Sequence, residues 1–560
     1  MLSGRSRFLA IAFLSLGIAS AKDEAVEPGR RKTEQDVKQG VSAELQKQID
    51  QAIEKARKYL MDGCAGSGFA KRRAEQLEAQ VKQYADLVVQ YRKQAADAKA
   101  KGGKDAAQVG QFEQTANSLE QNAKSFDQQA QALRKSIAGQ EAKAGTPEPP
   151  LYESLQFGLG EEALIGLALL QAGVSPYDPM IQRIWKDQYS QPIPTQHTTY
   201  AVGLQLMLVD AMMHAPCGDA WPEGRPKAKD VKKSRKAMKE SLDSPIRKDE
   251  VLAWIQKRVD ALAGAAQGGA WGYTLTGYGV AAAPSKGAYR VGGDEGPEIG
   301  SPELVKMVTD AKGQYDYSNT QYAVLGLKAA ALCGVRPRDS DALWRQVLQQ
   351  FLTGQKTDGK EVMLLLEAEG GKGRESAFLK KGWEEVDTGG GRRRKARSRG
   401  WGYTRYQAPK PPVPGQPQVQ QMEDVRATMT AAGLTALLVG RSELKLMPKE
   451  VEKVDEGVRD GLAWMQENWT QVAARSGYMI YGLERMGVLG GLRCVGGHDW
   501  YVEGAKTLIQ GQAAEGNWPG GYSLPVETSL CLLFLTRGTR EAYARPSYDI
   551  GELAPEKPKP

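Results

Sequence analysis

"QAAEGNWPGG" (residues 512–521) places a tryptophan inside a turn whose other residues are small or polar. A similar combination occurs twice upstream. "QGGAWGYT" (267–274) has Gln, Gly and Trp in the same order, and "RGWGYTRY" (399–406) keeps the Gly-Trp pair. Because an unusual turn recurs, it indicates a repeated architectural unit.

These turns lie among two kinds of helical segment. Six segments carry apolar residues at spacings of three and four with charges opposite, which is typical of a helix with one solvent-facing side. They are 48–63, 177–188, 251–264, 341–355, 454–468 and 500–512. Signals for β-strands are nearly absent, so the alternation predicts an all-α repeat that closes into a ring or stacks as a solenoid. The other six segments are apolar and rich in small residues: 160–174, 198–213, 318–335, 426–440, 476–489 and 526–538.

Residues 72–142 follow a different pattern. Apolar residues recur at alternating steps of four and three from Leu77 to Ala98, and again from Phe112 to Ile137. This is the a/d stripe of a coiled coil, and the "KGGKD" between the two stripes indicates a turn. We expect an antiparallel coiled-coil hairpin inserted after the first helix. It would serve as a solvated structural arm or dimerisation rod, or alternatively as a partner-binding arm.

The N-terminus (1–21) has the three parts of an export signal. Arg5 and Arg7 precede a short apolar stretch, and Ala19-Ser20-Ala21 is a typical cleavage site. The apolar stretch is too short to span a bilayer as a helix, although a retained anchor is the alternative. We therefore expect an exported protein, secreted or held in the periplasm or cell envelope, without a membrane span after cleavage. Removing the two arginines changes the formal charge of +8 to +6. Residues 541–560 form a tail rich in Pro and Lys.

The repeated turn resembles the Q-W repeat of squalene/hopene cyclases, the prenyltransferase/squalene oxidase repeat family, and more loosely that of protein prenyltransferase β-subunits. The resemblance covers residues 46–70, the first outer helix, and 151–540. It implies an α/α toroid of six inner and six outer helices, with 72–142 as an insertion. We interpret the indoles as staples that stack on helix ends, with glutamines bonding free backbone groups of the turns. The residues that fit the repeat are Gln267, Trp271, Gln512 and Trp518, and Trp401 keeps only the Gly-Trp part.

The resemblance also implies a catalytic acid. In the cyclases a D-x-D-D-T-A motif at the start of an inner helix protonates the isoprenoid. The corresponding "DYSNTQ" (316–321) keeps Asp316 and Thr320 but has Ser and Asn in place of the central carboxylates, and neither supplies that proton. Asn319 and Thr320 are interpreted as helix-capping residues. Asp424 and Glu527 are further acids near the starts of inner helices. Capping is the simpler interpretation of these acids, and an acidic ring at the toroid mouth is the alternative.

The prenyltransferase branch implies a zinc site of Asp, Cys and His. Cys494, His498 and Asp499 are the candidates, but "GGLRCVGGHDWY" (490–501) indicates a loop in which Asp499 caps the last outer helix. We therefore expect no metal site and no cofactor. The five cysteines are widely spaced and two lie in apolar helical segments, so we expect no disulfide framework.

The favoured hypothesis is an exported, non-catalytic toroid that binds a ligand or partner through its central cavity and its arm. The alternative is a terpenoid cyclase or prenyltransferase-like enzyme acting on isoprenoids, with Asp424 or Glu527 as its acid, and a weaker third is a carbohydrate-active toroid. The partner would be a protein or an anionic envelope polymer, and the cavity would suit an apolar ligand. Two basic runs, 225–239 and 389–400, are expected to be solvated loops. Nucleic acid is not an expected partner of an exported protein.

Overall fold

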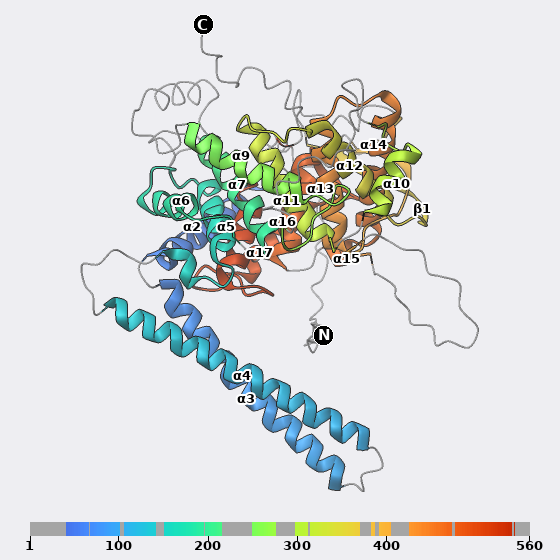
Figure 1. The fold of residues 1–560 in the computed structure, drawn as a ribbon. Helices are drawn as coiled ribbons and strands as arrows, with labels where there is room; N and C mark the ends of the chain where they lie inside the picture. Colours follow the sequence, from blue (N-terminus) through green and yellow to red (C-terminus); the bar gives the residue numbers. More distant parts are fainter. Residues whose placement is uncertain are drawn as a thin grey trace.

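The computed structural model describes residues 41–65, 68–100, 106–141, 150–194, 197–214, 249–275, 297–311, 314–369, 382–386, 391–404, 425–472, 476–539 and 543. Within these residues the protein is mainly helical (Figure 1). None of the helices described is long and apolar enough to cross a bilayer. The expected signal peptide 1–21, the basic run 225–239 and Asp424 lie outside the described residues, as does the tail 541–560 apart from Tyr543.

Six largely buried helices form the centre of the molecule, and we call them the inner helices. Each packs on the next in chain order, and the last packs on the first, so the order of contacts closes. Contacts between residues near the helix starts indicate that neighbouring inner helices run in the same direction. Gly160 lies against Ala201, and Gly477 lies against Glu527. The inner helices are α5 (Gly158–Gln171), α7 (Thr198–His214), α11 (Tyr317–Leu332), α13 (Ala427–Glu443), α16 (Gly477–Gly490) and α18 (Leu524–Leu535).

A second set of helices, the outer helices, packs around the inner ones and returns the chain between them. Their apolar stripes face inward and their charged faces remain exposed, as the three-and-four spacing predicts. They are α2 (Ala43–Cys64), α6 (Pro179–Ser190), α9 (Asp249–Ala265), α12 (Ser340–Gly354), α14 (Pro448–Glu467) and α17 (Trp500–Gly511). Shorter elements supplement them: η1 (Leu151–Ser154), α10 (Pro302–Asp310) and α15 (Trp469–Val472).

The tryptophan turns join the end of an outer helix to the next inner helix. Each indole is buried, and its Nε1–H donates to a carbonyl in the last turn of the preceding outer helix. The acceptors are Leu262 for Trp271 (2.7 Å), Phe351 for Trp401 (2.8 Å) and Leu508 for Trp518 (2.8 Å). The backbone N–H of each Trp donates in turn to a threonine near the start of the next inner helix: Thr320 (3.0 Å), Thr430 (3.2 Å) and Thr528 (3.4 Å).

Glutamine side chains connect one outer helix to another. Gln512 Nε2 donates to the carbonyl of Gly516 in its own turn at 3.0 Å and to that of Ala52 in α2 at 2.9 Å. The last outer helix is thereby tied to the first. Gly516 has φ +94°, and a Cβ there would lie 2.4 Å from the carbonyl oxygen of Lys55 in α2. Only glycine permits this approach.

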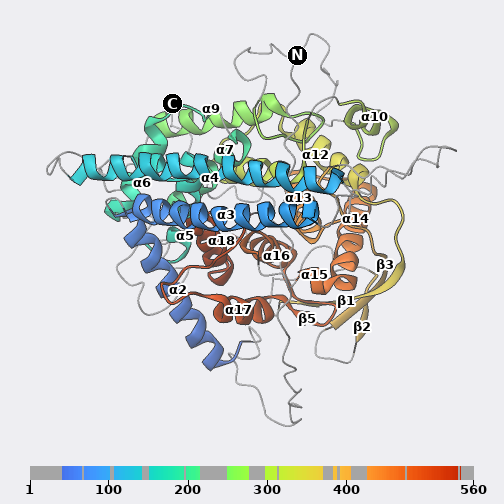
Figure 2. The ribbon, with the colours of Figure 1, turned by 90° about the horizontal axis from the view of Figure 1, so that it is seen from below.

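Two long helices, α3 (Gly68–Ala100) and α4 (Ala106–Glu141), extend from the body as a hairpin and lie side by side in both views (Figures 1 and 2). The start of α3 meets the end of α4, since Arg134 Nε lies 2.9 Å from Glu78 Oε1, so the pair is antiparallel. Tyr84 packs edge-on against Phe126, with ring centroids 5.4 Å apart. The two aromatic residues belong to the predicted stripes. Supercoiling of the pair stays a prediction.

A five-stranded antiparallel sheet departs from the expectation that strands are nearly absent. The basic segment expected to be a solvated loop forms a strand, because its charges pair across the sheet: Arg393 Nε lies 2.9 Å from Glu384 and Lys395 Nζ 3.0 Å from Glu361. The "GGLRCVGGHDWY" segment likewise contains a short strand pair. The strands, in sheet order, are β2 (Glu384–Val386), β3 (Gly391–Arg397), β1 (Glu361–Ala368), β4 (Leu492–Val495) and β5 (His498–Asp499).

If the indoles hold the helix junctions, Trp271→Ala and Trp518→Ala should each lower the free energy of unfolding by about 3–5 kcal/mol. Trp271→Phe should lose clearly less, because the ring remains and only the hydrogen bond and part of the packing are removed. Denaturant unfolding followed by circular dichroism measures both effects. Alanine variants that unfold at the wild-type denaturant concentration would show that the indoles do not carry the junctions.

Candidate functional site

Among the described residues, six tyrosines gather where the inner helices begin, and we call this cluster the tyrosine mouth. The rings of Tyr200 and Tyr322 are 4.8 Å apart between centroids, and the hydroxyls of Tyr273 and Tyr403 are 2.7 Å apart. Tyr273 and Tyr522 are 42% and 45% exposed. These residues are far apart in the sequence, and the fold brings them together. The six are Tyr200, Tyr273, Tyr322, Tyr403, Tyr478 and Tyr522, and rings within the cluster approach to centroid distances of 4.8–6.4 Å.

Below the mouth, polar side chains from three inner helices meet in the interior. Ser318 of α11 bonds the hydroxyls of both Tyr200 and Tyr478, and Gln321 Nε2 donates to Tyr478. Arg485 of α16 then donates from Nη2 to Gln321 Oε1 at 2.8 Å. Because α11 and α16 are not consecutive in the closed order, these contacts cross the space between the inner helices. We call these five residues the central polar network.

Arg485 gives this interior a permanent positive charge. The residue is 1% exposed, and its guanidinium lies 4.2 Å from the ring centroid of Tyr481. Burial opposes ionisation, but the surrounding tyrosines outweigh it and raise the pKa of Arg485 above its usual value. A fixed cation repels a second cation at short range. This interior is therefore ill suited to a carbocation intermediate.

Asp316 adjoins the mouth and is the N-cap of α11. Its Oδ1 accepts from the backbone N–H of Asn319 at 2.7 Å, and its Oδ2 from the side-chain amide of Asn319 at 2.8 Å. Burial raises the pKa of Asp316, against the opposing effect of hydrogen bonds from Asn319 and Tyr403. The N-cap is thus Asp316, and not Asn319 or Thr320 as the sequence suggested. Asn319 instead donates to Asp316, and the Thr320 hydroxyl accepts the backbone N–H of Trp271.

Glu527 accepts hydrogen bonds from the backbone at the start of α16 and from the backbone of the loop before α18. Its carboxylate receives N–H groups from Gly477 at 2.9 Å, Gly521 at 2.8 Å and Tyr522 at 3.2 Å, and the residue is 1% exposed. Glu161 in α5 similarly accepts from the backbone of Phe157 at 2.9 Å. These contacts hold the loops at the mouth in place. They engage Glu527 as a hydrogen-bond acceptor.

The metal candidates taken from the sequence have other contacts. Cys494 and Asp499 face each other across β4 and β5, and Asp499 caps α17 by accepting from Val502 N at 3.0 Å. His498 stacks on Trp469 with centroids 4.5 Å apart, and its Nδ1 lies 3.0 Å from Glu503. Cys64, Cys494 and Cys531 are buried thiols.

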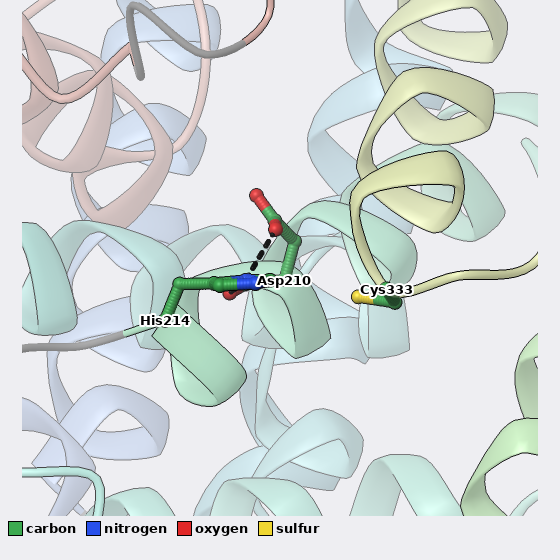
Figure 3. A group of neighbouring side chains, drawn as sticks. All are labelled: Asp210, His214 and Cys333. Carbon is green, nitrogen blue, oxygen red and sulfur yellow. Dashed lines mark hydrogen bonds and ion pairs between the residues drawn. The ribbon is translucent and has the colours of Figure 1, made fainter. Parts of the chain in front are cut away.

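A different set of metal-ligating side chains does come together in the described part of the chain. Asp210 and His214 of α7 lie beside Cys333, which follows α11 (Figure 3). Sequence reasoning missed this group, although the spacing of Asp210 and His214, one helical turn apart, is a usable signal. Cys333 supplies no such signal, because it is more than a hundred residues away in the chain.

The raised pKa of Asp316 predicts a pH dependence of stability. Folding disfavours the ionised carboxylate, so the stability linked to this group is greatest below the pKa of an unfolded Asp, about 3.9. That stability is lost as pH rises through the higher pKa of the folded protein. Asp316→Asn keeps a capping acceptor and abolishes the titration. Between about pH 3 and pH 7 the difference in unfolding free energy should therefore shift in favour of the variant. A shift in favour of the wild type would contradict this assignment.

Comparison with known proteins adds no assignment to this site. No family model matches the chain, and neither a curated protein nor a solved structure is significantly similar to it. The resemblance to squalene/hopene cyclases and prenyltransferases therefore rests on the residues of the repeated turns and on the contacts they make.

Proposed function

We propose that this chain is an exported α/α toroid of the squalene/hopene cyclase and prenyltransferase type that acts as a binding scaffold without isoprenoid chemistry. Support for the toroid comes from the closed order of the inner helices and the outer helix that returns the chain between them. The recurring hydrogen bonds from an indole to a helix end, and from a Trp backbone N–H to a threonine, also support the toroid. Export rests on the signal-like residues 1–21.

The central polar network carries the proposal. Cyclisation needs an apolar chamber and π faces around the developing cation. Here Ser318, Gln321 and Arg485 bond one another or their neighbours across that space, and Arg485 adds a positive charge. Two pockets lie elsewhere. One of about 30 Å³ lies between the start of α3 and the loops near Glu161, and one of about 240 Å³ lies beside Gly300 and Lys453.

The tyrosine mouth is the surface on which we place the partner, and we commit to a protein partner. Tyrosine is enriched at protein interfaces because it offers a large amphipathic ring at little cost in side-chain entropy. The α3–α4 hairpin leaves the body on the same side, since Phe69 and Arg73 of α3 line a pocket with Glu161, at the start of an inner helix. The mouth and the arm would contact the same partner.

A photo-crosslinking amino acid tests this surface. Benzoylphenylalanine in place of Tyr273 or Tyr522 should give one discrete crosslinked protein in the cell envelope of the source organism. The matched controls are Tyr177 and Tyr189, which are 41% and 39% exposed but lie at the outer helix α6. The purified partner should then bind the wild type and lose about tenfold in affinity with Tyr273→Ala. Equal crosslinking at all four positions would remove the mouth from consideration.

The enzyme alternative is tested separately. The purified mature protein should convert neither squalene nor a soluble isoprenoid to a cyclic product above the level of a protein-free control. Ser318→Asp with Asn319→Asp, which restores the missing carboxylates, should also yield no product, because Arg485 remains in the interior. Product formed by the wild type and abolished by Asp316→Asn would overturn the scaffold proposal.

A further inference from the structure

Helices α7 and α11 approach each other closely at a pair of glycines. A Cβ on Gly326 would lie 2.7 Å from Gly203 Cα, and one on Gly203 would lie 2.4 Å from the carbonyl oxygen of Tyr322. Asp210 follows Gly203 by seven residues, and Cys333 follows Gly326 by seven. Seven residues make about two helical turns, so both positions return to the face on which the helices touch. Close packing at the glycines thereby brings a carboxylate and a thiol together two turns further on.

His214 completes a group of three side chains (Figure 3). One ligand atom from each of Asp210, His214 and Cys333 lies within 4.8 Å of the others. The Oδ1 of Asp210 and Nδ1 of His214 are 2.8 Å apart. Asp210 is fully buried, Cys333 is 9% exposed, and the His214 side chain is 12% exposed. The group is therefore shielded from bulk water, with His214 on its outer side.

The electrostatic surroundings favour a cation at this position. Helix α7 ends at His214, and Cys333 is the C-cap of α11, so the partially negative ends of two helices meet there. A carboxylate and a thiolate together neutralise a divalent ion, which avoids burying net charge. Lys328 interacts electrostatically with Asp210 but is itself paired with Glu443. Tyr543 donates to Asp210 Oδ2 at 3.0 Å and orients the carboxylate from behind.

We propose that Asp210, His214 and Cys333 bind a zinc ion that clamps the ends of α7 and α11 together. Imidazole and thiolate suit zinc, whereas calcium and magnesium require oxygen ligands. Zinc bonds of about 2.0–2.3 Å bring ligand atoms to within about 4 Å of one another, which small side-chain rotations from the observed spacing achieve. Three protein ligands leave a fourth position for water or another donor. The site lies at the opposite ends of α7 and α11 from the tyrosine mouth, so it does not depend on the binding function proposed there.

Cobalt(II) titration of the metal-stripped full chain tests the site, since cobalt replaces zinc and its thiolate bond absorbs in the near ultraviolet. The wild type should bind one equivalent with a thiolate-to-cobalt band, and added zinc should displace it. Cys333→Ser should abolish the band, and His214→Ala and Asp210→Asn should weaken binding by at least about tenfold. The matched controls are Cys494→Ser and His498→Ala, which remove another Cys and His from the described chain. They should leave the titration unchanged.

Two outcomes would overturn the proposal: a wild-type titration without the thiolate band, or a band that persists in Cys333→Ser. Far-ultraviolet circular dichroism establishes that each variant is folded. If Cys333→Ser does not fold, alkylation of the native wild type provides a second measurement. Zinc should slow maleimide labelling of Cys333, identified by peptide mass spectrometry, and should leave the labelling of Cys494 unaffected. Equal labelling of Cys333 with and without zinc would then contradict the site.

Discussion

The structure depends on a hydrogen bond that a tryptophan makes to the end of a helix. A helix leaves its last carbonyls without partners, and an outer helix that ends against the core cannot satisfy all of them with water. Trp271, Trp401 and Trp518 each donate an indole N–H to a carbonyl in the last turn of a helix while filling the gap to the next inner helix. One side chain thus satisfies a buried polar group and supplies a large apolar surface. Because the same contact recurs, the inner helices α11, α13 and α18 lie in similar positions relative to the tryptophan turns that precede them.

The shared direction of the inner helices separates the partial charges of their ends. Because inner helices run in the same direction, their partially positive ends gather at the tyrosine mouth and their negative ends at the opposite side. Buried acids lie at the mouth, where Asp316 and Glu527 accept backbone N–H groups. At the opposite side Lys328 is buried against Glu443, and Arg441 pairs with Asp455 at 2.7 Å. The partially positive helix ends and their backbone N–H groups thus account for the acidic residues near the starts of the inner helices.

The sequence predicts the helices well and the sites poorly, for physical reasons that differ. Periodicity and small-residue content are local properties, so the stretches 160–174 and 318–335 were sufficient to predict α5 and α11. The strand β3 was missed because its run of arginines is balanced by glutamates on other strands, including Glu384 on β2. Such cross-strand pairing is not visible in a local pattern.

The sites require residues from distant parts of the chain. The repeated turn indicates where Trp271 lies, but the role of Thr320 depends on the register between a turn and the next inner helix. The tyrosine mouth draws on α7, α11, α16 and the turns between them, so a sparse supply of aromatic residues still yields a dense cluster. Composition alone therefore does not predict such a cluster, whereas local periodicity does predict the helices.

The central polar network fills the space between the inner helices with hydrogen bonds and a buried cation. Two nitrogens of the Arg485 guanidinium, Nε and Nη1, make no hydrogen bond within the part of the chain that the structure describes, which is costly for a buried cation. The faces of Tyr481 and Tyr322, at 4.2 and 5.4 Å from the guanidinium carbon, offset part of that cost. A substrate chamber would have to displace these contacts and leave the guanidinium exposed to an apolar ligand. The rings of Tyr322 and Tyr481, which would face a carbocation in an open cavity, are already occupied by a protein cation, and this supports the proposal that a partner binds at the exposed tyrosines of the mouth instead.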